Sequence, residues 1–182
     1  YAVRLRESIV YGHEKWVEFG RVAGDLRSPL DARTRANFIN RHIVTRIQTI
    51  FADDNGVRVV SVRGFIQLVL LKSRLILRFK KLDSKGRSRN VLTKAQRLWF
   101  SPAAKLPEAP PEAVRLIAGY VLDVVSAELT QVLVTLPNGP YAVMWAIELP
   151  DAGGANVVEM PRRTPKQPTP PPVRSRKAKT ES

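Results

Sequence analysis

The sequence predicts an α+β protein in which two N-terminal helices pack on an antiparallel sheet of about five strands, with one short helix inserted. The first observation is that apolar residues recur every three or four positions up to Phe51, which is typical of helices. The second is that the period changes to two from Val57 onward, which is typical of strands. The third is the size of the chain, since 182 residues with 44% hydrophobic content suffice for one domain with a core.

We therefore assign residues 1–160 to a single domain. The remaining residues, 161–182, contain six prolines and almost no apolar side chains. Such a composition cannot offset the entropy of ordering, so we expect this segment to be a disordered, Pro-rich basic tail.

The first helix is predicted over Arg4–Phe19. Apolar and small residues form one stripe along it, and His13 lies at the edge of that stripe. Because no second histidine or acid cluster is nearby in the sequence, we expect His13 to be packed and hydrogen-bonded rather than a ligand or a base. The stripe consists of Leu5, Ile9, Gly12, Trp16 and Phe19.

A second helix is predicted to begin at Ser28 and to end near Phe51. Ser28 is a good N-cap, Pro29 suits the first helical position, and Asp31 completes a pattern that resembles a capping box. The residues 53–56, which read Asp-Asp-Asn-Gly, then stop the helix, because glycine readily adopts the left-handed terminal conformation.

Three residues share one flank of this second helix. At about 100° per residue, Arg35, His42 and Arg46 fall within roughly 40° of one another on a helical wheel. Such a flank fits contact with phosphate, and it fits a solvated helix edge equally well. Both interpretations stay open on the sequence alone.

Strands are predicted over Val57–Val62, Phe65–Leu71 and Arg74–Lys81. In the last of these the alternation is clean, with three apolar residues on one face and three cations on the other. We expect the apolar face to pack on the core and the cationic face to be exposed to solvent. The apolar residues are Leu75, Leu77 and Phe79, and the cations are Arg74, Arg78 and Lys80.

The inserted helix is predicted to begin after Thr93, where Thr-Lys-Ala-Gln fits a capping box, and to carry Trp99 into the core. A proline-rich connection follows over 102–111. The segment Arg115–Leu122 is ambiguous between a strand and a buried helix, and we favour a strand. Two further strands, at 131–136 and 141–149, flank Pro-Asn-Gly, a strong hairpin signal.

The charge of the chain is concentrated in two segments. The net charge is +14, of which the stretch Lys72–Arg97 contributes +9 and the tail contributes +6, so the rest sums to −1. Scattered charge fits a solvated surface, whereas two dense blocks indicate a polyanionic partner. Nucleic acid is the first such partner to consider, and it is either DNA or RNA.

Several classes of protein are excluded or weakly supported. Without cysteine there is no disulfide, no thiolate metal site and no zinc finger. No G-x-S-x-G, phosphate-loop or dinucleotide-binding motif occurs. The catalytic interpretation therefore has little support, and we assign no catalytic residue, no metal ligand and no cofactor. A metal-dependent nuclease is the third alternative, with Asp83 and Asp54 as its nearest candidate acids. No apolar run is long enough to span a bilayer, so we expect a cytoplasmic protein.

The leading interpretation is a non-enzymatic protein that binds nucleic acid through a basic hairpin face and a basic tail. No pair of exposed aromatics accompanies the cations, so the expected contact is with the phosphate backbone and has little sequence preference. The alternative is a protein-interaction module, an antitoxin-like or accessory subunit that docks an acidic partner. The candidate nucleic-acid-binding residues are Arg74, Arg78, Lys80, Lys81, Lys85, Arg87, Arg89, Lys94, Arg97, Arg174, Arg176 and Lys177.

Four short segments carry a resemblance to known proteins. They are RFKKLD at 78–83, RSRN at 87–90, AGYVLD at 118–123 and WAIEL at 145–149. These segments resemble an uncharacterised group of small bacterial accessory proteins from mobile-element or stress-operon neighbourhoods. The resemblance implies a regulatory or accessory role, and it implies no functional residue.

Overall fold

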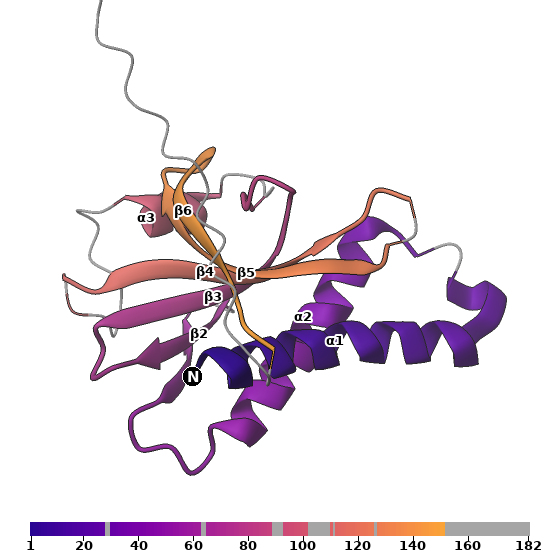
Figure 1. Cartoon of the computed structure of the whole chain (residues 1–182), viewed down its shortest axis with the longest axis horizontal. Helices are drawn as coiled ribbons and strands as arrows, with labels where there is room; N and C mark the ends of the chain where they lie inside the picture. The colour runs from indigo at the N-terminus through magenta and orange to yellow at the C-terminus, as the bar shows by residue number, and fades with distance from the viewer. Residues whose placement is uncertain are drawn as a thin grey trace, which may run out of the picture.

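A computed structural model of the chain describes residues 1–27, 30–62, 65–88, 93–101, 110, 112–125 and 127–151 (Figure 1). The predicted tail at 161–182 lies outside the described residues, and so do the candidate binding residues Arg89, Arg174, Arg176 and Lys177. None of the described helices combines the length and the apolar character that crossing a membrane requires.

The two N-terminal helices are α1 (Ala2–Ala23) and α2 (Ala32–Ile50), joined through the 3-10 helix η1 (Gly24–Arg27). They cross at Gly12, where an added Cβ would lie 2.5 Å from Ile43 Cγ1 and 2.8 Å from the Ile39 carbonyl oxygen. The glycine thus permits a close approach of the two backbones. The predicted stripe of α1 is buried apart from Phe19, which is half-buried, and His13 is packed as expected, with Nε2 3.1 Å from the Ala127 carbonyl oxygen.

Helix α2 begins later than the sequence predicted. Its N-cap is Asp31, whose carboxylate accepts a hydrogen bond from the Thr34 amide at 2.6 Å. The expectation that Ser28 caps this helix is wrong, because residues 30 and 31 are not helical. Both residue types are good N-caps, so local preference did not decide between them.

The sheet has six strands, in the order of the sequence. All neighbouring pairs are antiparallel except β3 and β4, which run parallel, with Leu77 opposite Leu116. The predicted α+β class is confirmed, but the sheet is mixed and six-stranded rather than antiparallel with about five strands. The strands are β1 (Arg58–Val62), β2 (Phe65–Leu70), β3 (Leu75–Leu82), β4 (Val114–Leu122), β5 (Leu129–Asn138) and β6 (Ala142–Glu148).

The parallel pair arises from the connection between β3 and β4. This connection is long and contains α3 (Lys94–Phe100). Such a crossover returns the chain to the end of the sheet at which β3 begins, so that β4 runs in the same direction as β3. Helix α3 begins as predicted, since the Thr93 hydroxyl accepts a hydrogen bond from the Gln96 amide at 3.3 Å. The ambiguous segment at 115–122 is a strand, as we favoured.

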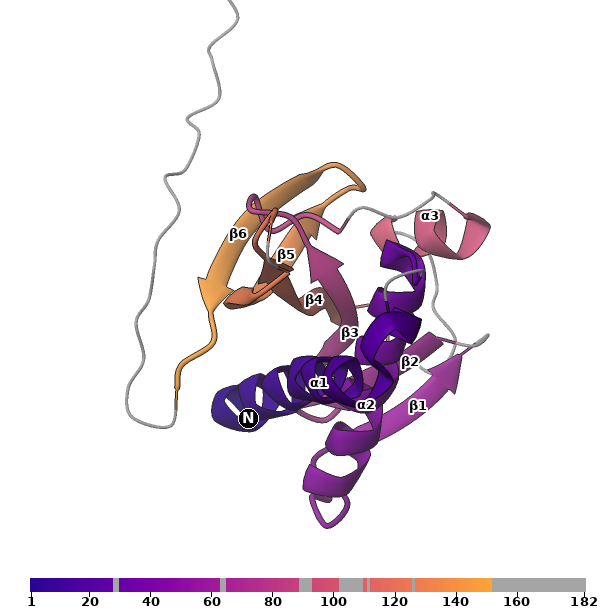
Figure 2. The same ribbon diagram turned by 90° about the vertical axis from the view of Figure 1, so that its right-hand side faces the viewer.

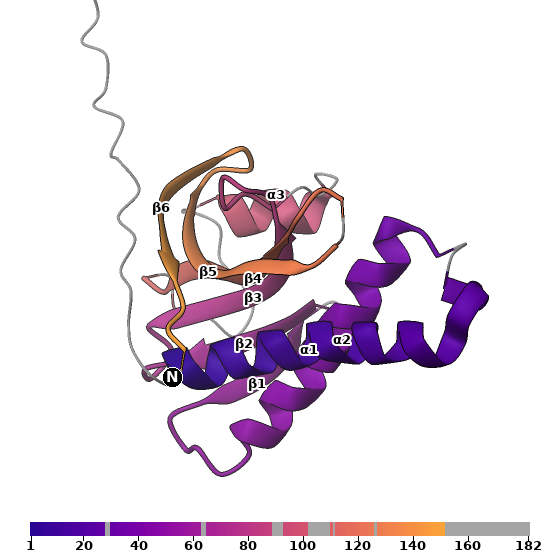
Figure 3. The ribbon, with the colours of Figure 1, turned by 45° about the vertical axis from the view of Figure 1, so that its right-hand side comes forward.

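Helices cover both faces of the sheet. Figures 1 and 3 show α1 and α2 on one side and α3 on the other. On the α1–α2 side, Leu77 and Phe79 of β3 belong to the main core cluster. On the α3 side, Ile76 packs with Trp99 in a second cluster, and Leu82 lies in a third. Both faces of β3 are therefore buried along most of its length.

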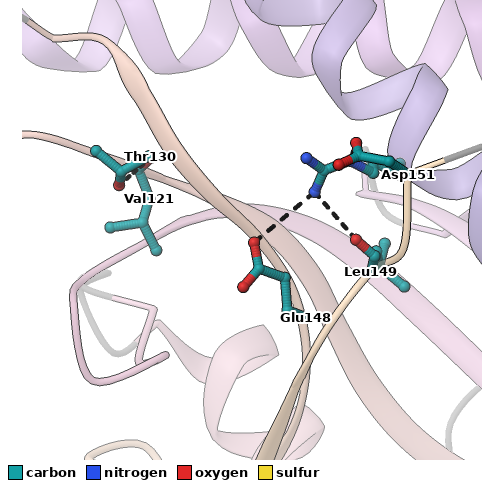
Figure 4. Close-up of polar contacts among 6 residues, drawn as sticks. Val121, Thr130, Glu148, Leu149 and Asp151 are labelled. Atoms are coloured by element: carbon teal, nitrogen blue, oxygen red, sulfur yellow. Dashed lines mark hydrogen bonds and ion pairs between the residues drawn. The ribbon is translucent and has the colours of Figure 1, made fainter. Parts of the chain in front are cut away.

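The end of the sheet is tied to α1. Arg6 donates a hydrogen bond to the Leu149 carbonyl oxygen at 3.0 Å and pairs with Glu148 and Asp151, which Figure 4 shows gathered where the chain leaves β6. Figure 2 shows β5 and β6 bending toward the side that carries α3.

Candidate cationic surface around β3

The cations of β3 do not form one exposed row. Arg74 precedes the strand and is exposed, but Arg78 is only 4% exposed. The expectation that Arg78 lies on a solvent-exposed face is therefore wrong. Helix α3 covers that face, and the Arg78 guanidinium carbon lies 4.0 Å from the centroid of the Trp99 ring, a cation–π contact.

The buried environment of Arg78 changes its electrostatics. Burial and the nearby charge of Arg115 lower the pKa of Arg78 to about 10, which leaves it protonated at neutral pH. Lys80 lies two residues further along the same face and is half-buried, and its pKa is lowered by burial and by the Arg78 charge. The α3 side of the sheet thus holds positive charge beneath its surface.

Arg115 is a residue that sequence reasoning missed. Its guanidinium donates hydrogen bonds to three carbonyl oxygens at the end of α3, those of Leu98 at 3.0 Å, Trp99 at 3.2 Å and Ser101 at 2.5 Å. Cations at this position satisfy the free carbonyls of a helix C-terminus. The one signal in the sequence was a lone cation at the start of an apolar strand.

The loop after β3 is organised by Asp83. Its carboxylate accepts hydrogen bonds from the Lys85 amide at 2.9 Å, from the Arg87 amide at 3.0 Å and from Arg87 Nε at 2.9 Å. Burial alone would raise the pKa of Asp83, but these hydrogen bonds outweigh it and hold the pKa below its usual value. Arg87 and Asp83 are therefore occupied with each other, and Arg87 is less available to a partner than Lys85.

Five candidate cations remain accessible around β3, and we call them the β3 cations. Arg74 precedes the strand, Lys81 lies near its end on the face toward α1 and α2, and Lys85 follows in the loop. Lys94 and Arg97 lie on α3, which covers the other face. All five are exposed, and none forms an ion pair with the described residues. Several carboxylates elsewhere are already paired, as in Asp54 with Arg4 at 2.7 Å.

Two of the three residues on the predicted flank of α2 contact neighbouring side chains, and the third, Arg35, has no ion-pair partner among the described residues. Arg46 pairs with Glu7 and lies 5.3 Å from the centroid of the Tyr11 ring. His42 packs against Phe38, with ring centroids 4.6 Å apart and ring planes tilted by 45°. Arg35 is half-buried and has no ion-pair partner within the described ranges, and its charge acts on residues of the sheet.

The hollows beside α3 are small or open. One holds about 10 Å³, roughly the space for a single water molecule. The other is open to solvent, holds about 240 Å³ and is lined by Arg97, Phe100, Ser101 and Pro140. Among the residues that the structure describes, no group of three or more His, Asp or Glu side chains could hold a metal ion. The arrangement suits contact with an extended anionic partner better than enclosure of a small substrate.

Comparison with known proteins gives no further guide to this surface. No family model, no curated protein and no solved structure matches the chain.

Proposed function

We propose that this protein binds the phosphate backbone of nucleic acid. The β3 cations form the part of the interface that lies on the folded domain. The single observation that carries the proposal is that these five exposed cations, which form no ion pair with the described residues, gather around β3 and α3, where the carboxylate of Asp83 is already bonded to Arg87. Cations without internal partners are free to displace the counterions of a polyanion, which is the main source of nonspecific affinity for nucleic acid.

The proposal assigns different tasks to the cations of the stretch 72–97. Arg78 is buried against Trp99, and it supports α3 rather than contacting phosphate directly. Arg87 holds the loop that presents Lys85. The exposed side chains then contact phosphates without reading bases, because positioning contacts carry no sequence information. The regulatory or accessory role that the resemblance implies, and a contribution from the basic tail, belong to the same proposal.

The test is fluorescence anisotropy with labelled duplex DNA, single-stranded DNA and structured RNA, at about 50 and 200 mM salt. We expect binding that weakens steeply with salt. A double charge reversal, Lys94→Glu with Arg97→Glu, removes two cations of α3 and is expected to weaken binding at least about tenfold at the lower salt concentration.

The matched control is Arg21→Glu with Arg41→Glu. These two exposed cations lie on α1 and α2, and their reversal changes the net charge by the same amount. Equal loss of binding in both double variants would show that only total charge matters, and the β3 cations would no longer be the interface. No binding to any polymer by the wild-type chain would overturn the nucleic-acid function itself.

A second candidate function is docking of a protein partner, and the edge strand β6 favours it. In the described part of the sheet β6 pairs only with β5, and Tyr141 and Met144 beside it are 71% and 64% exposed. Exposed apolar groups on an open strand edge suit addition of a strand from a partner. If oligonucleotides fail to bind, affinity capture with the intact chain and with a Met144→Lys variant tests this alternative.

A further inference from the structure

We propose that Arg35 of α2, Lys81 of β3 and the hydroxyl of Tyr120 of β4 form a binding site for one phosphate group. The site lies on the α1–α2 side of the sheet, opposite α3. It rests on the proposed nucleic-acid function for the source of the phosphate, and it adds a discrete anion site on the face opposite α3.

The sheet itself brings two of the three groups together. Lys81 and Tyr120 are partners in the parallel register of β3 and β4, so their side chains leave neighbouring backbone positions on the same face. Lys81 is exposed, whereas Tyr120 is only 1% exposed. An exposed cation and a buried aromatic residue therefore occupy neighbouring positions on one face of the sheet.

The Tyr120 hydroxyl has an unmet hydrogen-bonding requirement. Its oxygen is buried and has no hydrogen-bond partner among the described residues. Buried hydroxyl groups nearly always find a partner, because leaving one unsatisfied costs free energy. Burial raises the pKa of Tyr120, and the Arg35 charge opposes that effect without cancelling it, so the hydroxyl keeps its proton and can donate it to an anion.

Arg35 brings a second cation to the same place. It lies in the first turn of α2, and its charge acts on both Lys81 and Tyr120. Burial and Arg35 both lower the pKa of Lys81, and no carboxylate among the described residues opposes them. Two cations whose charges act on each other repel, and a bound anion would reduce that repulsion.

The chemistry of the three groups suits phosphate. An arginine and a lysine supply charge-assisted donors, and arginine matches the geometry of phosphate oxygens with two parallel hydrogen bonds. The tyrosine hydroxyl supplies a further donor from beneath. The exposed side chain of Lys81 changes rotamer rapidly, which is the movement that a phosphate needs to reach the hydroxyl. The ligand is either a terminal phosphate, a backbone phosphate or a free phosphate ion, since all three present the same oxygens.

The first arm of the test uses inorganic phosphate and the full chain. Binding is followed by the line width of the ³¹P resonance and by the rise in melting temperature, against chloride at matched ionic strength. We expect saturable binding that Arg35→Gln and Lys81→Gln each weaken by about tenfold, because each removes a charged hydrogen bond. Tyr120→Phe is expected to weaken it by about threefold and to leave the melting temperature without phosphate unchanged or higher, because it removes an unsatisfied hydroxyl.

The matched control is Arg33→Gln, two residues from Arg35 and exposed on the first turn of the same helix. It removes the same charge and should leave phosphate binding unchanged. If Arg33→Gln weakens binding as much as Arg35→Gln, or if inorganic phosphate shows no saturable binding, the site is wrong.

The second arm identifies the source of the phosphate. Stronger binding of a 5′-phosphorylated oligonucleotide than of its 5′-hydroxyl form, with the difference lost in Arg35→Gln, indicates a terminal phosphate. Equal binding of the two forms, with both weakened by Arg35→Gln, indicates a backbone phosphate. Oligonucleotide binding that depends on Lys94 and Arg97 but not on Arg35 would overturn this site and leave the proposed function standing. Saturable binding of inorganic phosphate without any oligonucleotide binding would support this site and overturn the proposed function.

Discussion

The two faces of β3 are buried to a similar degree but carry different chemistry. Toward α1 and α2, Leu77 and Phe79 are 2% and 3% exposed within a large apolar cluster. Toward α3, Ile76 is fully buried, and the next residue on that face is the cation Arg78. Alternation along a strand thus defines which residues share a face, but it does not define what covers that face. A cation in an alternating strand is a surface residue only where no element packs over it.

The largest loss of stability is expected for a substitution at Gly119 of β4, which lies beside β3. An alanine Cβ there would lie 2.0 Å from the Lys80 carbonyl oxygen and 2.9 Å from Leu82 Cγ. Because a backbone atom of the neighbouring strand would have to move, we expect Gly119→Ala to lower the free energy of unfolding by about 3 kcal/mol or more. Urea denaturation followed by tryptophan fluorescence measures this loss.

The comparison variant on the opposite side is Gly12→Ala, where an added Cβ would lie 2.5 Å from Ile43 Cγ1 and 2.8 Å from the Ile39 carbonyl oxygen, a milder backbone clash than the one at Gly119. Two helices shift apart more readily than two hydrogen-bonded strands, so a smaller loss is expected. A larger loss in Gly12→Ala than in Gly119→Ala would contradict the close approach of β3 and β4.

The next largest effect is expected at Arg78. Truncation in Arg78→Ala removes the contact with Trp99 and leaves a cavity under α3, so the free energy of unfolding should fall by about 3 kcal/mol. The control is Arg74→Ala, an exposed cation at the start of the same strand, for which a change within about 0.5 kcal/mol is expected. Equal losses of stability in the two variants would mean that Arg78 is exposed like Arg74, as the sequence predicted.

A smaller, pH-dependent effect is expected at Asp83. Asp83→Asn weakens the hydrogen bonds that hold the Lys85–Arg87 turn, at a cost of about 1–2 kcal/mol near pH 7. The pKa of Asp83 is lowered in the folded protein, so its stabilisation is complete above the unfolded value of about 4 and is lost as the pH falls through the lowered pKa.

Denaturation of wild type and Asp83→Asn at about pH 7 and about pH 2.5 tests this sign. The difference between the two proteins should shrink at the lower pH. A difference that is the same at both pH values would mean that the charge of Asp83 does not support the turn.

The parts of the fold that depend on local sequence could be predicted. The stripe of α1 and the Thr93 cap of α3 follow from neighbouring residues and are present. The predicted hairpin is also present, but its loop lies at 139–141, because Pro137 and Asn138 still pair with β6. The parallel pairing of β3 with β4 could not be predicted, because it depends on where a long crossover returns the chain.

The burial of Arg78 also depends on distant residues, but the sequence carried a signal for it. Ile76 lies between Arg74 and Arg78 on the face predicted to be exposed, and an apolar residue there indicates some cover. The continuous apolar run of β4 is a second signal, since it is typical of a strand buried on both faces. The effect of the Arg35 charge on Lys81 depends on the packing of α2 against β3, two elements far apart in the sequence, so no local sequence pattern could have predicted it.

The most direct test of the account compares two arginines given the same substitution. Arg97→Met removes an exposed cation of α3, and Arg78→Met removes the buried one with a similar change of side-chain volume. The measurement is the slope of the logarithm of the duplex-DNA binding constant against the logarithm of the salt concentration. We predict that Arg97→Met flattens the slope by about 0.9, the effect of one lost phosphate contact, and that Arg78→Met leaves it unchanged. Equal flattening by both substitutions, or no binding of duplex DNA by the wild-type protein, would contradict the account.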